Sequence, residues 1–418
     1  MAWLRSILTA ALLLAASGLA FGQTESVLYT FQGQPDGYFP ESSLVIGGAG
    51  NLYGTTTYGG GGACYVDPYS GCGFIYELVP PAAAGSEWTE IPVWRFQGGT
   101  DGGNPGGLLT YEGQLWGVAG AGGTGPCTGG CGYFFRLEPP SSPEGAWTKV
   151  VVFDFPGPNY FCRISAVDTN GNFYGTGLTS QRPDGYVCEL QKTQSGYTTI
   201  DLYDFQGVPK GRRIGDGSYP ISVAFDAQGN LWGAAADGGY CQPTPDGSCF
   251  GALFELKPPA ASSGEWSETV VYRFPLSNAN PTSPVTVDPS GAVFGLTSVQ
   301  AYKYLDGRLT KITDHPGVPP FGAAPTGGLV LDRDGNVYGT MGAGGAYGYG
   351  TVYELLAPDY TPKLLYSFAG GADGSLPCAP MIFGPDGVLY GTTQTGGNQG
   401  CQLGFGGIGC GTVFQLVP

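Results

Sequence analysis

The strongest constraint on the fold is a five-residue motif that recurs seven times. Each copy has a glycine, a variable residue, an apolar residue, an aromatic residue and a second glycine, as in GNLYG and GNVYG. The aromatic residues are Tyr53, Trp116, Tyr174, Trp232, Phe294, Tyr338 and Tyr390. Intervals of 44 to 63 residues between them indicate a repeated unit with constant strands and loops of variable length.

Each copy is accompanied by three further strand-like segments. A short apolar run precedes the motif, a run such as GFIYEL or GTVYEL follows a Gly-rich loop, and a run such as VLYTF or LLYSF ends the unit. With 76 glycines, 34 prolines and 12% charged residues, the composition favours tight turns over helices. Seven units of four strands predict an all-β chain, a seven-bladed β-propeller with four antiparallel strands per blade. The fifth unit departs most, with AYKYL and RLTKI in place of its last two strands.

The two ends of the repeat array favour a closed ring over an open solenoid. The chain enters the array with a fourth-strand segment, Val27 to Phe31, and leaves it with a third-strand segment, Gly411 to Leu416. We expect these segments to pair and complete the last blade, because closure removes an exposed sheet edge. An open solenoid gains nothing from this offset.

The ordered recurrence of GNLYGTT, GCGFIYEL, GTVYEL, GSEWTE and LLYSFAGGADG resembles the Gloeo-Verruco (GloVer) tandem repeat of exported bacterial proteins. The resemblance extends over essentially the whole mature chain. The D-x-x-G-N-L-W element is also similar to repeats in the periplasmic sensor propellers of two-component regulators. These resemblances imply a propeller-like, exported protein and supply no biochemical activity.

The N-terminus predicts export. Arg5 precedes an apolar run from Ile7 to Ala16, and small residues before Gln23 form a cleavage-site pattern. Residues 1–22 are therefore interpreted as a signal peptide and 23–418 as one propeller domain, secreted to the extracellular space or the periplasm. The alternative, an uncleaved anchor, is disfavoured because the run is short for a bilayer core. A net charge of −16 disfavours nucleic-acid and membrane-surface partners.

Eleven cysteines suit an oxidising compartment. Four close pairs in Gly-rich loops predict local disulfides: Cys64 with Cys72, Cys127 with Cys131, Cys241 with Cys249, and Cys401 with Cys410. The spacing differs from that of zinc sites, and His315 is the only histidine, so no metal site and no cofactor are predicted. Cys162, Cys188 and Cys378 remain, which leaves at least one free thiol or a different pairing.

Candidate ligand residues gather on one predicted face. In an antiparallel blade, the loop between strands 2 and 3 and the connection from strand 4 to the next blade emerge on the same side. The connections carry a D-G-x-x-P element, in which the aspartate either binds a ligand such as calcium or accepts hydrogen bonds from its own turn. One carboxylate per loop favours the turn interpretation. The candidate ligand-binding residues on this loop-rich face are Asp36, Tyr38, Tyr65, Asp101, Asp216, Tyr219, Tyr240 and Asp373.

Other recurring residues are interpreted as scaffold. Trp88, Trp147 and Trp266 begin outer strands and are expected to pack between blades. The acids Glu77, Glu189, Glu255 and Glu354 occur once per blade away from the axis, which predicts salt bridges or solvated strand ends. The stretch DRDGN from Asp332 resembles an ion-binding loop, but its counterparts vary at Asp334, which indicates a tight turn.

The sequence thus predicts a secreted, non-catalytic binding module whose loop-rich face binds an extracellular glycan or a cell-surface protein. One alternative is a propeller enzyme, a lyase or glycosidase that uses acidic and Tyr residues on the same face. A second alternative is a structural scaffold of the envelope. No catalytic residue is assigned.

Overall fold

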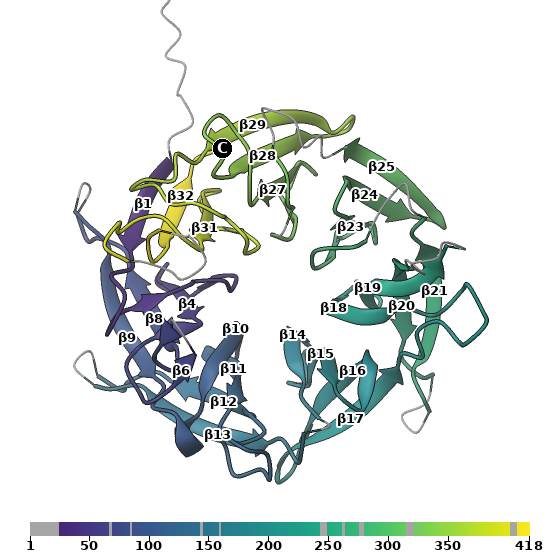
Figure 1. Ribbon diagram of the computed structural model, residues 1–418, viewed down its shortest axis with the longest axis horizontal. Helices are drawn as coiled ribbons and strands as arrows, with labels where there is room; N and C mark the ends of the chain where they lie inside the picture. The colour runs from purple at the N-terminus through teal and green to yellow at the C-terminus, as the bar shows by residue number, and fades with distance from the viewer. Residues whose placement is uncertain are drawn as a thin grey trace, which may run out of the picture.

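The computed structural model describes residues 25–418 apart from 67–68, 84–85, 143–144, 159, 243–248, 261–263, 276–279, 315–321, 326 and 402–407. In these residues, seven sheets of four antiparallel strands form a ring around one axis, as Figure 1 shows. The predicted seven-bladed β-propeller is therefore confirmed. The predicted signal peptide (1–22) and His315 lie outside the described residues.

The blades are numbered along the chain, and their strands are given from the axis outward. Blade 1 contains β3 (Val45–Ile46), β4 (Leu52–Thr56), β8 (Phe74–Val79) and β9 (Thr89–Arg95). Blade 2 contains β10 (Gly103–Tyr111), β11 (Gln114–Ala121), β12 (Tyr133–Glu138) and β13 (Thr148–Asp154). Blade 3 contains β14 (Arg163–Val167), β15 (Phe173–Thr179), β16 (Arg182–Thr193) and β17 (Gly196–Asp204). Blade 4 contains β18 (Ser218–Phe225), β19 (Leu231–Cys241), β20 (Cys249–Lys257) and β21 (Ser267–Arg273).

The remaining blades follow the same order. Blade 5 contains β22 (Thr286–Val287), β23 (Val293–Leu296), β24 (Gln300–Leu305) and β25 (Arg308–Asp314), so the irregular fifth unit also forms four strands. Blade 6 contains β26 (Val330–Leu331), β27 (Val337–Met341), β28 (Thr351–Leu356) and β29 (Thr361–Ser367). Blade 7 contains β30 (Ile382–Phe383), β31 (Leu389–Thr393), β32 (Thr412–Leu416) and β1 (Glu25–Thr30). Two short pairs, β2 (Gly37–Tyr38) with β5 (Tyr58–Gly59) and β6 (Tyr65–Val66) with β7 (Tyr69–Ser70), and the 3-10 helix η1 (Gly99–Asp101) lie in the connections.

The ring closes as predicted. β1 pairs antiparallel with β32 from Glu25 opposite Leu416 to Thr30 opposite Thr412. The N-terminal strand is therefore the outermost strand of blade 7 (Figure 1). Because the two ends of the chain share one sheet, unfolding of either end opens the ring. Among the described residues, no helix has the length and apolar character needed to cross a membrane.

The repeated glycine of the second strand makes room for an aromatic ring. Gly54 lies opposite Tyr76, and a Cβ on Gly54 would lie 2.3 Å from the Tyr76 hydroxyl. Gly339 has the same relationship with Tyr353. Both tyrosines are fully buried, so the glycine allows a large ring to fill the interior of the blade.

The turns between the first two strands are held by an aspartate. The Asp332 carboxylate accepts hydrogen bonds from the backbone N–H groups of Asp334 and Asn336, both at 2.9 Å, and from the Tyr338 hydroxyl at 3.1 Å. Gly335 has φ of 83°, which the turn requires. The stretch DRDGN is therefore a turn, as predicted.

The recurring tryptophans pack between blades, which confirms that prediction. Trp147 of blade 2 lies edge-on to Tyr53 of blade 1, with ring centroids 5.7 Å apart. Trp88 contacts Tyr390 edge-on, and Trp266 contacts Tyr174 at a tilted angle, across their own blade interfaces. Each pair joins the outer strand of one blade to the second strand of the preceding blade.

Candidate functional site

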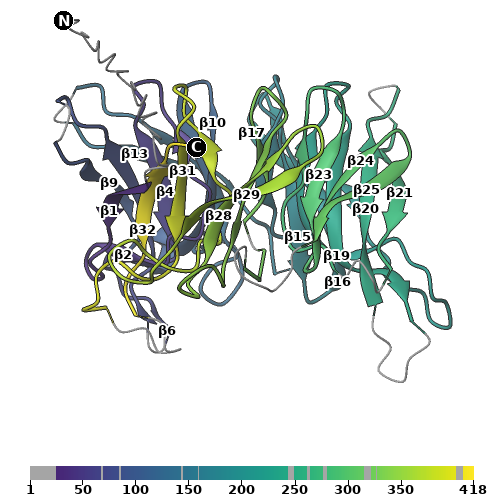
Figure 2. The ribbon, with the colours of Figure 1, turned by 90° about the horizontal axis from the view of Figure 1, so that it is seen from above.

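The loops and the blade connections share one face of the ring, as predicted. β2 of the first connection pairs with β5 of the adjacent loop, and single bridges repeat this contact in other blades, for example Ser375 with Thr395. Figure 2 shows β2 and β6 on the same side of the ring. The long loops and blade connections lie on this face. Because binding residues are commonly found on loops, this loop-rich face is the first place to look for a ligand site.

A cavity of about 660 Å³ lies on the propeller axis. Residues at or just before the first strands of six blades line it, and these strands surround the centre of Figure 1. Thr57, Asn104 and Gly120, at the loop-side ends of their strands, also line the cavity, so it opens toward the loop-rich face. The volume is within the range of small-molecule and cofactor sites.

Three of the six hydroxyl side chains that line the cavity, those of Ser43, Thr55 and Ser165, connect neighbouring blades. Ser43 donates to the Pro380 carbonyl at 3.0 Å, joining blades 1 and 7. Ser165 donates to the Val223 carbonyl at 2.8 Å and accepts from the Val223 N–H at 3.0 Å, joining blades 3 and 4. These bonds fix the first strands relative to one another. The cavity is therefore a pre-formed and rigid space.

Two charged residues, Glu41 and Arg163, line the cavity within the described chain. The Glu41 carboxylate accepts hydrogen bonds from the Thr57 hydroxyl, at 3.3 Å, and from the Gln394 amide. Arg163 is exposed, and its guanidinium has no hydrogen bond or ion pair to the described part of the protein. The cavity thus has one carboxylate, Glu41, and one unpaired cation, Arg163, among its described lining residues.

Blade 3 enters the ring differently from the other blades. It lacks the D-G-x-x-P element, as blades 5 and 6 do, and Cys162 at its entry forms a disulfide with Cys188 of β16. Cys188 lies opposite Gly175, where the other blades have an aromatic ring. A Cβ on Gly175 would lie 2.0 Å from the Arg163 carbonyl oxygen, so here the backbone of the first strand occupies the space of the ring.

Phe161 fixes the other side of this entry. Its N–H donates to the Tyr186 hydroxyl at 2.7 Å, and that hydroxyl donates to the Phe161 carbonyl at 2.9 Å. Phe161 is half-buried and is among the residues that line the cavity, and its ring centroid lies 5.4 Å from that of Phe155. Phe161 and Arg163 are thus held on both sides of the buried Cys162–Cys188 disulfide.

The aspartates of the D-G-x-x-P elements bind their own turns. Asp216 accepts from the Tyr203 hydroxyl at 2.7 Å and from the Gln206 N–H at 3.0 Å. Asp36 and Asp373 make the corresponding contacts, with Tyr29 and Gln32 and with Tyr366 and Ala369. The four aspartates lie at four different blade junctions, and none lines the axial cavity.

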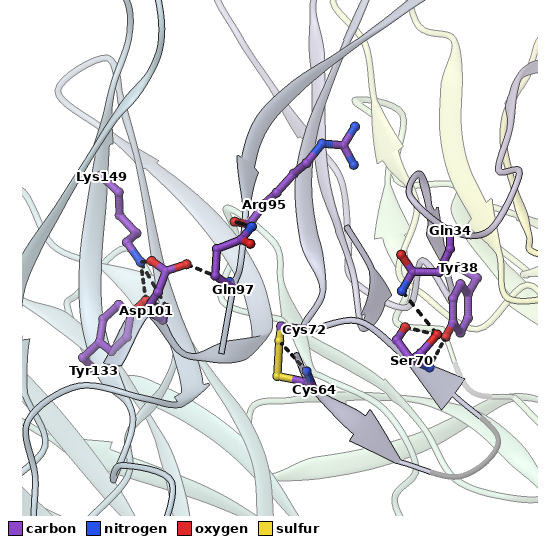
Figure 3. The surroundings of a disulfide bond; sticks show 10 residues. All are labelled: Gln34, Tyr38, Cys64, Ser70, Cys72, Arg95, Gln97, Asp101, Tyr133 and Lys149. Carbon is purple, nitrogen blue, oxygen red and sulfur yellow. Dashed lines mark hydrogen bonds and ion pairs between the residues drawn. A yellow bond between two sulfur atoms is a disulfide. The ribbon is translucent and has the colours of Figure 1, made fainter. Parts of the chain in front are cut away.

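Asp101 shows a variation of this arrangement (Figure 3). It accepts from the Gln97 N–H at 2.8 Å and forms an ion pair with Lys149, whose Nζ lies 2.5 Å from Oδ1. The rings of Trp94, Phe96 and Tyr133 surround the ammonium group. Burial lowers the pKa of Lys149, and the hydrogen bond and charge of Asp101 oppose this effect.

The candidate tyrosines do not converge on one point. Tyr38 is buried, and its hydroxyl donates to the Ser70 carbonyl at 2.6 Å and accepts from the Ser70 N–H at 2.6 Å (Figure 3). Tyr240 is half-buried and pairs with Phe250 in the β19–β20 ladder. Tyr219 is exposed, with φ of 57° before Pro220. Tyr65 lies in the β6–β7 hairpin.

Three glutamates share the blade interfaces with these aspartates. Glu25, Glu90 and Glu268 lie opposite Leu416, Leu78 and Leu256 at equivalent positions of outer strands. Burial, followed by repulsion from Asp373, Asp36 and Asp216, raises the pKa of each to about 7. Each has a buried Oε1 atom without a hydrogen-bond partner in the described residues. These carboxyl pairs lie within the wall, away from the axial cavity.

The third-strand glutamates are buried, so they are not solvated strand ends, whereas the alternative prediction of salt bridges is confirmed for Glu255 with Lys257 and for Glu354 with Lys363. Glu77 accepts from the Tyr53 hydroxyl at 2.7 Å, and Glu354 accepts from the Tyr338 hydroxyl at 2.7 Å and pairs with Lys363. In the blades where the repeated motif carries a tyrosine, its hydroxyl supplies the hydrogen bond that the buried carboxylate of Glu77, Glu189 or Glu354 needs.

The structure contains the four disulfides that the close spacing predicts. They join Cys64 to Cys72, Cys127 to Cys131, Cys241 to Cys249 and Cys401 to Cys410. Of the three remaining cysteines, Cys162 pairs with Cys188 and Cys378 is free. In the described part of the chain, no group of three or more His, Cys, Asp or Glu side chains has the geometry to hold a metal ion.

The sequence interpretation missed Glu41, Phe161 and Arg163. All three line the cavity, and Arg163 is the only charged residue at its position around the ring. A signal was present: blade 3 has FCRIS at the start of its first strand, where the other six units have a neutral residue at the position of Arg163. A departure from the repeat was more informative here than the recurring residues.

Comparisons with known proteins support the fold. No protein-family model matches the chain, so the GloVer resemblance stays a prediction. No curated protein matches it either. Among solved structures, the extracellular domain of a hybrid two-component system from B. thetaiotaomicron is similar, with a TM-score of 0.51 and 12% identity over 93% of this chain and 41% of that one.

A second extracellular domain, from a one-component system of B. thetaiotaomicron, has a TM-score of 0.50 and 9% identity, over 92% of this chain and 40% of that one. The chain therefore spans about 40% of the length of these two solved domains. A gluconolactonase from Xanthomonas campestris matches at a TM-score of 0.39 with 12% identity, over 94% of this chain and 89% of that one. At these identities the likeness concerns the fold alone.

Proposed function

We propose that this protein is an exported, non-catalytic binding module that holds an extracellular glycan in its axial cavity. The observation that carries the proposal is the cavity of about 660 Å³, which opens toward the loop-rich face. Its wall combines hydroxyl groups and glycines with Phe161 and many aliphatic residues, such as Leu108, Ile164 and Val285. Such a surface offers polar and apolar contacts to a ligand that carries many hydroxyl groups.

The rigidity of the wall supports binding. Hydrogen bonds between blades, such as Ser43 to Pro380 and Ser165 to Val223, hold the first strands in place before any ligand arrives. A pre-formed site loses little conformational entropy on binding. Five disulfides and the extracellular domains among the structural neighbours support a location outside the cytoplasm.

The alternatives have less support from the cavity. Glycosidases commonly need two carboxyl groups a few ångströms apart, whereas Glu41 is the one carboxylate among the described lining residues. A scaffold, or a partner protein bound to the rim alone, makes no use of an open axial space. Binding of a glycan is the function that the geometry supports best.

Filling the cavity tests the proposal. No heavy atom lies within 4 Å of the Cβ position of Gly107, and its backbone is outside the left-handed region, so Gly107→Trp places a ring in the cavity without backbone strain. Gly48→Trp is the matched control, because Gly48 has equally open surroundings in a turn on the opposite face. We expect a glycan array and calorimetry to show binding that Gly107→Trp abolishes and Gly48→Trp retains. Binding that survives Gly107→Trp, or no binding to any glycan, overturns the proposal.

A further inference from the structure

We infer that the axial cavity selects carboxylated sugars, with the Arg163 guanidinium binding the carboxylate of a uronate residue. This inference rests on the proposed glycan-binding function and specifies its ligand class. It follows from the position of Arg163 around the ring, from its lack of a protein partner, and from the way blade 3 holds it.

Arg163 is the only charge at its position in the seven blades. It directly precedes Ile164, the residue opposite the repeated glycine of the second strand. The equivalent residues before Leu44, Leu108, Val223, Val285, Leu329 and Met381 are neutral, and they are Ser43, Gly107, Ser222, Pro284, Gly328 and Pro380. The first strands thus provide a ring of small or rigid residues into which one blade places a cation.

Several exposed cations of this acidic protein, such as Arg212 and Arg333, have no ion pair in the described chain, but Arg163 is the one that lines the axial cavity. The net charge is −16, and carboxylates pair with other cations, as in Lys149 with Asp101 and Arg182 with Asp201. Arg163 forms no ion pair or hydrogen bond in the described chain, although Glu41 lines the same cavity. Its five donors are therefore free for a ligand.

The local structure holds the backbone of Arg163 in place. The Cys162–Cys188 disulfide ties the preceding residue to β16, and Gly175 allows the Arg163 carbonyl to approach β15. Both Cys162 and Cys188 are fully buried. The replacement of an aromatic residue by a disulfide thus accompanies the one change in charge around the cavity.

The neighbouring groups match a sugar acid. A guanidinium binds a carboxylate through two parallel hydrogen bonds, and the apolar residues Phe161 and Ile164 line the same cavity and can contact the apolar face of a sugar. Glu41 can accept hydrogen bonds from sugar hydroxyls. Among its described lining residues, the cavity contains one cation, Arg163, and one carboxylate, Glu41. This charge balance suits a ligand carboxylate, which has one negative charge, better than a phosphate group, which has nearly two.

A second basic group lies on the same face. Lys210, Arg212 and Arg213 are exposed in the connection between β17 and β18, and the Cys241 N–H donates to the Arg213 carbonyl at 2.8 Å. None of the three side chains forms an ion pair within the described residues. Together with Arg163 they place positive charge on the loop-rich face around blades 3 and 4.

The test compares trisaccharides of galacturonate, glucuronate and mannuronate with their methyl esters, which keep the sugar and remove the charge. Calorimetry on the purified protein should detect at least one acid form, with the ester about tenfold or more weaker. Arg163→Gln should reduce affinity for the acid form to that for the ester. Arg333→Gln, an exposed arginine in a turn on the opposite face, should leave both affinities unchanged. Thermal unfolding of both variants establishes that they fold.

The outcomes separate this inference from the proposed function. If the acid and ester forms bind with equal affinity and Gly107→Trp abolishes the binding of both, the selection for carboxylates is overturned and the proposed glycan binding stands. If neutral glycans bind and none of the uronates does, the selection for carboxylates is likewise overturned and glycan binding stands. Full binding by Arg163→Gln overturns the role of Arg163. No binding to any glycan overturns both proposals.

Discussion

Lys149 forms an ion pair with Asp101 across the interface of blades 1 and 2, with 2.5 Å between Nζ and Oδ1. Lys149 lies opposite Leu137, the position that Glu25, Glu90 and Glu268 occupy in blades 7, 1 and 4. This position of the outer strand therefore places a cation beside Asp101 in blade 2. In blades 7, 1 and 4 the same position places a glutamate near the corresponding aspartate. This difference leads to separate predictions for the two kinds of interface.

Lys149→Ala should lower the free energy of unfolding by about 2–4 kcal/mol, because it leaves the largely buried Asp101 carboxylate without its cation. Urea unfolding followed by fluorescence measures the change. Lys311→Ala removes an exposed ion pair with Asp314 and should cost less than about 0.5 kcal/mol. Equal effects of the two substitutions would show that the Lys149 pair contributes no more than a surface pair.

Stability should fall as the pH rises from about 4.5 through 7. Glu25, Glu90 and Glu268 have an ordinary pKa near 4.5 when unfolded and a pKa of about 7 when folded, so the folded state binds more protons in this window. Each glutamate stays partly in water, so we expect about 1 kcal/mol or less from each. Tm at pH 5.5 should exceed Tm at pH 8, and Glu90→Gln should reduce the difference. A Glu90→Gln protein with an unchanged pH profile would contradict this assignment.

Gly54→Ala should destabilise the fold by about 1–3 kcal/mol, because the new methyl group would overlap the buried Tyr76 ring. Gly48→Ala, in an open turn, is the control and should change stability by no more than about 0.5 kcal/mol. Differential scanning calorimetry of the two variants tests the packing role of the repeated glycine. A neutral Gly54→Ala would mean that the ring can move aside.

Loss of the Cys162–Cys188 disulfide should cost more stability than loss of the Cys127–Cys131 disulfide. The two bonds join residues separated by 26 and 4 positions, and a longer loop loses more entropy in the unfolded chain when it is closed. We expect about 2–4 kcal/mol for the double change Cys162→Ala/Cys188→Ala. Urea unfolding of both double variants under oxidising conditions gives the comparison, and the reverse order would contradict it.

Cys378 should be the single reactive thiol and should react slowly in the folded protein. Burial raises the pKa of its thiol to about 12, so little thiolate is present at neutral pH. Titration with a maleimide should label about one thiol per chain in urea and much less without it. Labelling of three thiols in urea would show that Cys162 and Cys188 are not paired.

The recurring residues were sufficient to predict the ring. The seven motifs, the offset of Val27 to Phe31 from Gly411 to Leu416, and the tryptophans at outer strands all report local periodicity, which the folded chain preserves. The close cysteine pairs followed for the same reason, because short loops bring their ends together in any compact arrangement. The repeated unit by itself therefore determined the strand order, the closure of the ring and four disulfides.

The cavity and its charges were decided by the tertiary structure. Arg163 and Glu41 come from different blades, and they line one space only because seven first strands meet at the axis. The glutamate–aspartate pairs join residues from neighbouring blades or opposite ends of the chain, such as Glu25 near Asp373. Sequence periodicity describes each blade alone, whereas burial and charge at these positions depend on the neighbouring blade. That physical dependence is why the sequence determined the propeller and only the assembled ring revealed its candidate binding site.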